Sequence, residues 1–137
     1  MKAVLLLSLC IHFANGQTTL AIERRNEDDL IRILNRITPL TEKTSGELSI
    51  RVFTVSNFPG SAGYQSGEVT HQLYIAVSEH DEYPKQSLFT VGPIYNPKAK
   101  GWREGDKGQL LTIEYGPAKR RESITLRIGL ETIEVLE

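Results

Sequence analysis

Residues 109–136, QLLTIEYGPAKRRESITLRIGLETIEVL, carry the clearest structural pattern of this chain. Apolar and polar residues alternate on both sides of the turn sequence Gly116–Arg121. Alternation with a period of two is typical of a strand with one buried face, and a turn between two such runs predicts an antiparallel hairpin. Beyond Glu131 the apolar phase shifts, which predicts a bulge or a bend. The apolar positions are Leu111, Ile113 and Tyr115 before the turn, and Ile124, Leu126, Ile128, Leu130, Ile133 and Val135 after it.

Three stretches upstream repeat the alternation. Residues 48–55 are apolar at every second position until Phe53, where the phase shifts and a bulge is expected. Residues 73–77 carry little charge on either face, which favours a central strand. Residues 88–91 form a short strand that Gly92-Pro93 is expected to end. With the two strands of the hairpin, about five strands are expected, and a lead-in at residues 17–25 could add an edge strand.

A helical pattern precedes these strands at residues 27–38. Asn26 suits the N-cap position, and the acidic residues at 27–29 suit the positive end of the helix dipole. Pro39 is expected to end the helix because it disfavours the α conformation at Thr38. The apolar residues recur at helical spacing, at Leu30, Ile31, Leu34 and Ile37.

This order of elements predicts an α+β fold. One N-terminal helix is expected to pack on an antiparallel, bulged sheet of about five strands, because a helix and a sheet each need a partner for one apolar face. The alternative is a small β-sandwich with the helix as an appendage.

Residues 1–16 have the organisation of a secretory signal peptide. A positively charged start is followed by an apolar run, Ala3–Phe13, which is too short to span a membrane. Ala14 and Gly16 are the small residues that a signal peptidase reads. We therefore expect cleavage after Gly16 and a single globular domain, residues 17–137, that is secreted or periplasmic.

Charge and cysteine content narrow the classes of partner and chemistry. The net charge of −1 supplies no field to hold nucleic acid, so no nucleic-acid partner is expected. Cys10 is the only cysteine of the chain, so no disulfide forms within it. A lipid anchor on Cys10 is not expected, because Leu9 stands where that kind of site has a small residue. No motif for a metal, a cofactor or a nucleophile stands out, so no cofactor is expected and catalysis is not favoured.

The longest stretch without a period, residues 95–108, is expected to form a loop. It combines aromatic rings with positive charge, and this combination can anchor a protein or an anionic glycan. A second basic turn, residues 116–121, could lie on the same rim or on the opposite one. We expect a non-catalytic module that binds an unidentified protein or envelope glycan through these segments, and no oligomeric state is predicted. The candidate binding residues are Tyr95, Lys98, Lys100, Trp102 and Arg103.

Trp102 has a second interpretation, in which its ring folds inward and caps the core while the lysines solubilise the loop. The substitution Trp102→Ala separates the two, because a binding role predicts weaker binding with intact folding.

Two other function classes stay open. A pocket enclosed by the sheet and the helix would make the protein a carrier of a small apolar ligand, and its expected lining residues are Tyr74, Phe89 and Tyr115. An envelope hydrolase is the other class, in which His80 would act together with Asp81 or Glu82.

Overall fold

The computed structural model describes residues 24, 26–57 and 69–136. This part of the chain forms one short helix, α1 at Asp28–Leu34, and eight strands. The strands are β1 Ile37–Ser45, β2 Leu48–Ser56, β3 Thr70–Glu79, β4 Gln86–Tyr95, β5 Lys98–Gly105, β6 Gly108–Tyr115, β7 Glu122–Ile128 and β8 Ile133–Leu136.

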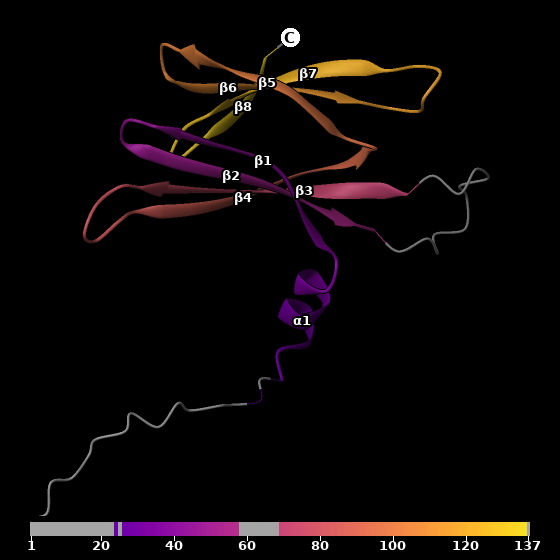
Figure 1. The fold of residues 1–137 in the computed structure, drawn as a ribbon, viewed down its shortest axis with the longest axis horizontal. Helices are drawn as coiled ribbons and strands as arrows, with labels where there is room; N and C mark the ends of the chain where they lie inside the picture. Colours follow the sequence, from indigo (N-terminus) through magenta and orange to yellow (C-terminus); the bar gives the residue numbers. More distant parts are fainter. Residues whose placement is uncertain (1–23, 25, 58–68, 137) are drawn as a thin grey trace, which may run out of the picture.

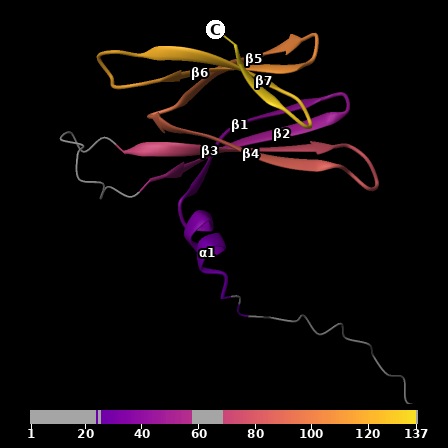
Figure 2. The same cartoon turned by 180° about the vertical axis from the view of Figure 1, so that it is seen from behind.

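The strands form two four-stranded antiparallel sheets. The first sheet has the order β1-β2-β3-β4 and the second has the order β5-β6-β7-β8. In each sheet, consecutive strands pair in an antiparallel register. The two sheets lie one above the other, and the chain passes from the first to the second between β4 and β5 (Figures 1 and 2).

One hydrophobic core fills the space between the sheets. It is built from the inward positions of β2 and β3 on one side and of β6 and β7 on the other, so it uses the alternation seen in the sequence. The side chains with no exposed surface are Ile50, Leu73, Ile75, Leu111, Ile113, Leu126 and Ile128.

Two side-chain hydrogen bonds join the sheets at β1. Nε1 of Trp102 donates to Oγ1 of Thr41 at 2.9 Å. Nε2 of Gln109 donates to Oγ of Ser45 at 3.0 Å. Because each bond connects β1 to β5 or β6, the first sheet is tied to the second along one edge as well as through the core.

The expected fold, a helix packed on one sheet of about five strands, is wrong. The structure is mostly β, with two four-stranded sheets, and α1 lies outside the sandwich (Figure 1). The observed arrangement is closer to the alternative of a sandwich with an appended helix. The period of two identifies a strand and its buried face, but it does not say which strands share a sheet.

The predicted helix at residues 27–38 is too long. The helix ends at Leu34, its N-cap is Glu27 without a side-chain cap bond, and none of its residues is buried. Ile37 and Pro39 instead belong to β1, where they pair with β2. An edge strand tolerates a proline, because its missing N–H need not bond to a further strand. Pairing along nine residues of β1 therefore outweighs the helical spacing of the apolar residues.

Residues 98–105 are a strand and not part of a loop. The bulge in β5 hides the alternation: Ala99 pairs with Ile113 and Gly101 with Thr112, so Lys100 is the extra residue. Ala99 and Trp102 consequently face the core three positions apart instead of two.

The bulge expected near Phe53 and the strand end expected at Gly92-Pro93 both lie at other positions in the structure. The bulge near Phe53 lies on the partner strand β1, between Pro39 and Thr41, while β2 keeps its register with β3 through Phe53. The strand expected to end at Gly92-Pro93 continues to Tyr95 as β4, and the Gly92-Pro93 peptide bond is cis.

At the C-terminal end, the expected bend lies at residues 130–131, where the chain reverses direction. The N–H of Gly129 donates to the carbonyl of Thr132 at 2.9 Å, and β8 then pairs with β7. The expected central position of residues 73–77 is confirmed, since β3 lies between β2 and β4.

Several predictions fall where the structure is not described. The expected signal peptide at residues 1–16 and almost all of the lead-in at 17–25 lie outside the described residues. The helix of the described part is neither long nor apolar enough to cross a membrane.

Core packing gives a direct test of the sandwich. We expect Ile75→Ala, at a position with no exposed surface, to lower the free energy of unfolding by about 2–5 kcal/mol, because it leaves a cavity between the sheets. The matched control is Leu88→Ala in the adjacent strand, where the side chain is 64% exposed and the expected change is within about 0.5 kcal/mol. Urea unfolding measures both, and equal losses would contradict the described core.

Candidate functional site

The five predicted binding residues do not lie on one loop. Tyr95 is the last residue of β4, and the other four lie on β5. Lys98 and Arg103 are exposed and pair with Glu114 and Leu110, so they lie on the outer face of the second sheet. Lys100 is the bulge residue, and its Nζ lies 3.5 Å from a carboxylate oxygen of Glu114.

Trp102 faces the other way. Its ring is half-buried and packs against the core, and its indole N–H donates to Thr41 in the first sheet. This geometry matches the second interpretation of Trp102, as a residue that caps the core, and it separates the ring from the lysines of the same strand.

The two basic segments meet at one end of the sandwich. The N–H of Gly116 donates to the carbonyl of Tyr95 at 2.9 Å, which joins the turn after β6 to the end of β4. The start of the segment 95–103 and the turn at residues 116–121 therefore share one rim, a point that the sequence pattern left open.

Arg121 holds this end together. Its guanidinium donates to the carbonyl oxygens of Asn96 at 3.0 Å and Glu114 at 3.1 Å, and also to the carbonyl of Gly116. Nε donates to Oε1 of Glu114 at 3.0 Å. These bonds connect three segments: the turn between β4 and β5, the end of β6 with the turn that follows it, and the residue before β7. A single side chain therefore holds three segments in place.

Two local backbone features shape the same turn region. Asn96 has a φ of 39°, a left-handed conformation that asparagine tolerates better than most residues. Gly116 has a φ of 106°, and a Cβ there would lie 2.6 Å from the carbonyl oxygen of Arg120. Glycine is therefore required for the chain to turn closely after β6.

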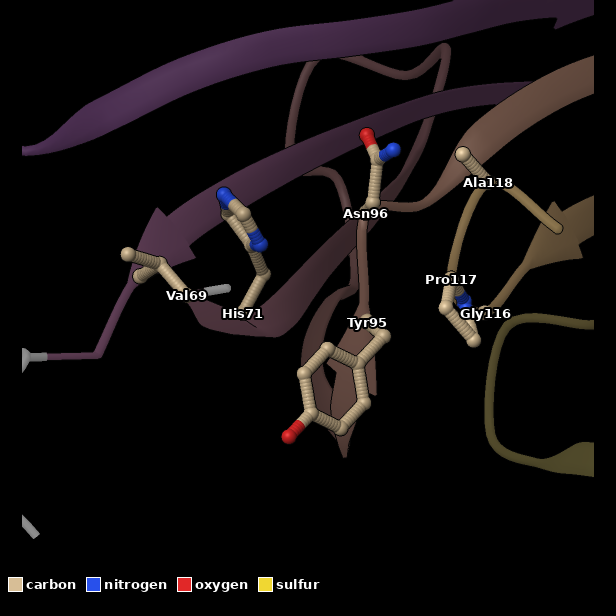
Figure 3. Close-up of a pocket in the computed structure, with 7 residues that line it drawn as sticks. All are labelled: Val69, His71, Tyr95, Asn96, Gly116, Pro117 and Ala118. Atoms are coloured by element: carbon tan, nitrogen blue, oxygen red, sulfur yellow. The ribbon is translucent and has the colours of Figure 1, made fainter. Parts of the chain in front are cut away.

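A cleft opens where these segments meet, and we call it the end cleft. Its volume is about 270 Å³, close to the lower limit for ligand sites. Figure 3 shows Tyr95 between the side of the cleft formed by β3 and the side formed by the turn after β6. Within the described part of the chain, no lining residue carries a carboxylate. The lining residues are Val69, His71, Tyr95, Asn96, Gly116, Pro117 and Ala118.

His71 lines the end cleft and has an unsatisfied polar atom. Nδ1 of His71 is buried and has no hydrogen-bond partner among the described residues. A buried polar atom without a partner is uncommon in folded proteins. The sequence pattern missed His71 and Val69 as site residues, because nothing in their spacing relates them to Tyr95 or to the distant turn.

The charges next to the end cleft are mainly positive. Among the described residues, Lys98 and Lys119 have no ion pair, whereas the nearby carboxylates of Glu114 and Glu122 are both engaged. The hydrogen bond from Arg121 is the main reason that the pKa of Glu114 lies below its ordinary value. The hydrogen bond to Glu122 is the main reason that the pKa of Tyr115 is raised.

The residues expected to line a carrier pocket do not meet. Phe89 pairs with the buried Ile75 and packs on the core. Tyr74 pairs with Thr90 and Phe53, so it lies on the outer face of the same sheet. Tyr115 belongs to the second sheet.

In the acidic turn around His80, the backbone N–H of His80 and the carboxylate of Asp81 make structural hydrogen bonds. The N–H of His80 donates to the carbonyl of Glu47 at 2.9 Å, and Oδ1 of Asp81 accepts the N–H of Glu82 at 2.6 Å. His71 and His80 lie at opposite ends of β3, whose bounds are Thr70–Glu79. In the described parts of the chain, no group of three or more His, Cys, Asp or Glu residues is arranged to hold a metal ion.

Other hollows, of about 350, 400 and 460 Å³, involve residues of the first sheet, and Tyr74 lines one of them and Phe53 another. Two of them are lined by both signs of charge, from Glu42 and Arg51 in one case, and the third is lined by Arg32, Arg36 and Tyr74. The end cleft differs in that the two predicted binding segments, at Tyr95 and at residues 116–121, meet beside it, and it is therefore the stronger candidate site.

The chain matches no family model, and no curated protein or solved structure is similar to it at a significant level. Function is therefore argued from the geometry of the site.

The hydrogen bond of Trp102 to the first sheet is testable by substitution. We expect Trp102→Phe to lower the free energy of unfolding by about 1 kcal/mol or more, because it removes the N–H donor to Thr41 and some packing area. Arg103→Ala, at the exposed neighbouring position, is the control and should change stability by less than about 0.5 kcal/mol. Chemical denaturation measures both, and an unchanged Trp102→Phe variant would show that the ring does not tie the sheets.

Glu114 predicts a pH dependence of stability. Because the fold lowers its pKa from 4.5, the ionised form stabilises the protein above that pH, and this contribution is lost as the pH falls through the lowered pKa. We expect Glu114→Gln to be less stable than the parent near neutral pH, with a difference that shrinks on acidification below 4.5. Thermal melts across this range measure it. Glu131→Gln, at an exposed turn position, is the control, and a pH-independent difference would contradict the assignment.

Proposed function

We propose that the protein is an exported, non-catalytic binding module that recognises a protein or an envelope glycan at the end cleft. The observation that carries the proposal is the meeting of Tyr95 with the basic turn at residues 116–121 around a cleft whose described lining residues include no carboxylate. Export is supported by the pattern of residues 1–16 alone, which lie outside the described residues.

The lining suits recognition of a ligand that is partly apolar. Val69, Tyr95 and Pro117 supply apolar surface, while His71 and Asn96 supply hydrogen-bonding groups. Binding sites commonly combine a mostly apolar wall with a few polar groups that set the ligand's orientation. An aromatic ring adds a large contact area and loses little conformational entropy on binding.

The rigidity of the rim also supports a binding role. Arg121 is bonded to three backbone carbonyls and to Glu114, so the turn is held in place before a ligand arrives. A site that is already ordered pays a smaller entropic cost on association. The rim cations contribute long-range attraction for a partner of opposite charge.

A substitution pair tests the proposal. Purified protein is screened on an array of envelope glycans and for retention of envelope proteins from its host. We expect Tyr95→Ala to weaken whatever binding is found by about tenfold or more, the effect of losing a central aromatic contact. The matched control is Tyr83→Ala, whose ring is 86% exposed in the turn at the opposite end of β4.

Melting curves of both variants establish that each is folded. Binding that Tyr95→Ala leaves unchanged would place the site elsewhere and contradict the proposal.

A further inference from the structure

The charge distribution around the end cleft is more specific than its shape. No described residue of the cleft lining carries a carboxylate, and Lys98 and Lys119 lie next to the lining in sequence, at Asn96-Pro97-Lys98 and Ala118-Lys119. Both cations are exposed and have no ion pair among the described residues. Because the full chain has a net charge of −1, this local excess of positive charge is a feature of one end and not of the whole surface.

The nearby carboxylates leave this excess uncompensated. Glu114 is shared between Arg121 and Lys100, and Glu122 accepts from Tyr115 at 3.1 Å and lies 3.7 Å from Arg120. Each carboxylate already has a cationic partner, so Lys98 and Lys119 are available to an anion from outside.

The positive charge also continues along the second sheet. Lys98 and Arg103 lie on the same outer face of β5, opposite Glu114 and Leu110 of β6. At about 3.3 Å per residue, they are separated by roughly 15 Å. Beyond Arg103 the positive charge ends, because the carboxylates of Glu104 and Asp106 are both exposed there. A ligand that contacts the cleft and Arg103 together is therefore an extended one with repeated negative charge.

We propose that the ligand of the end cleft is an acidic glycan, a chain of sugar rings that bear carboxylate or sulfate groups. This inference rests on the proposed function and assigns its ligand class. One ring occupies the cleft against Tyr95, while His71 and Asn96 lie within reach of its hydroxyl groups. The anionic groups are bound by Lys119 at the turn and by Lys98 on β5.

A glycan fits this geometry better than an acidic peptide. The cleft volume of about 270 Å³ accepts a single compact ring, and its wall offers the aromatic and apolar surface that the carbon face of a sugar ring covers. An acidic peptide presents charge on flexible side chains and would leave the aromatic wall at Tyr95 uncovered.

Four probes of matched size test the assignment by isothermal titration calorimetry. They are an oligogalacturonate, its methyl ester, a sulfated oligosaccharide and an oligoglutamate with the same number of charges as the oligogalacturonate. We expect the oligogalacturonate or the sulfated oligosaccharide to bind, and the stronger of the two identifies the anionic group. The neutral methyl ester and the oligoglutamate should each bind at least about tenfold more weakly, because one lacks the charge and the other lacks the ring.

Lysine substitutions locate the binding. We expect Lys119→Ala and Lys98→Ala each to weaken acidic-glycan binding several-fold, and the double variant to weaken it by about tenfold or more. Lys85→Ala, exposed in the turn at the opposite end of β4, is the control and should bind as the parent does. None of these exposed residues is part of the core, so the variants should fold normally.

The outcomes separate this inference from the proposed function. The acidic-glycan assignment is overturned if the methyl ester or the oligoglutamate binds as strongly as the acidic oligosaccharides. If Tyr95→Ala still weakens that binding, the binding site remains at the cleft. If none of the four probes binds while the protein still binds another partner in a Tyr95-dependent way, the acidic-glycan assignment is likewise overturned and the binding site stays at the cleft. Acidic-glycan binding that neither Tyr95→Ala nor the lysine variants alter overturns both.

Discussion

The structure depends on the burial of one apolar face of each sheet against the other. Neither four-stranded sheet could cover its own apolar face, and the chain has a single cysteine, so no disulfide supports the fold. The core side chains Ile75 and Leu126, from opposite sheets, are fully buried in one cluster. Burial of this kind is the dominant favourable term in folding. Burial alone does not set how the sheets are positioned, and the inter-sheet hydrogen bonds of Trp102 and Gln109 fix where β1 lies relative to the second sheet.

The end cleft is a consequence of how the chain leaves the first sheet. β4 ends at Tyr95, and the crossing to β5 brings this end against the turn that follows β6. Arg121 then binds both sides of the crossing and neutralises Glu114. The same residue therefore supports the fold and holds the rim of the candidate site in one conformation. Binding at this rim needs little reorganisation, which is the physical link between the fold and the proposed function.

Part of the candidate site could be recognised from residue types alone. Tyr95 and the turn at residues 116–121 were expected to take part in binding because aromatic and basic residues gather there. Trp102 shows the limit of that reasoning, since its ring packs inward while Lys98 on the same strand faces solvent. The bulge at Lys100 decides this difference by shifting the alternation of β5. A bulge depends on pairing with the neighbouring strand, so it cannot be predicted from the local sequence pattern.

By itself, the sequence determined which stretches alternate and which of their side chains are buried, because a period of two is a local property of an extended chain. The inward residues of β2, β3, β6 and β7 were predictable for this reason. Only the tertiary structure decided that the strands divide into two sheets, that residues 37 and 38 join β1 and not the helix, and that His71 meets Tyr95 and Pro117 at one cleft. These outcomes depend on contacts between residues far apart in the chain, and the free energy of such contacts outweighs local helical or loop preferences.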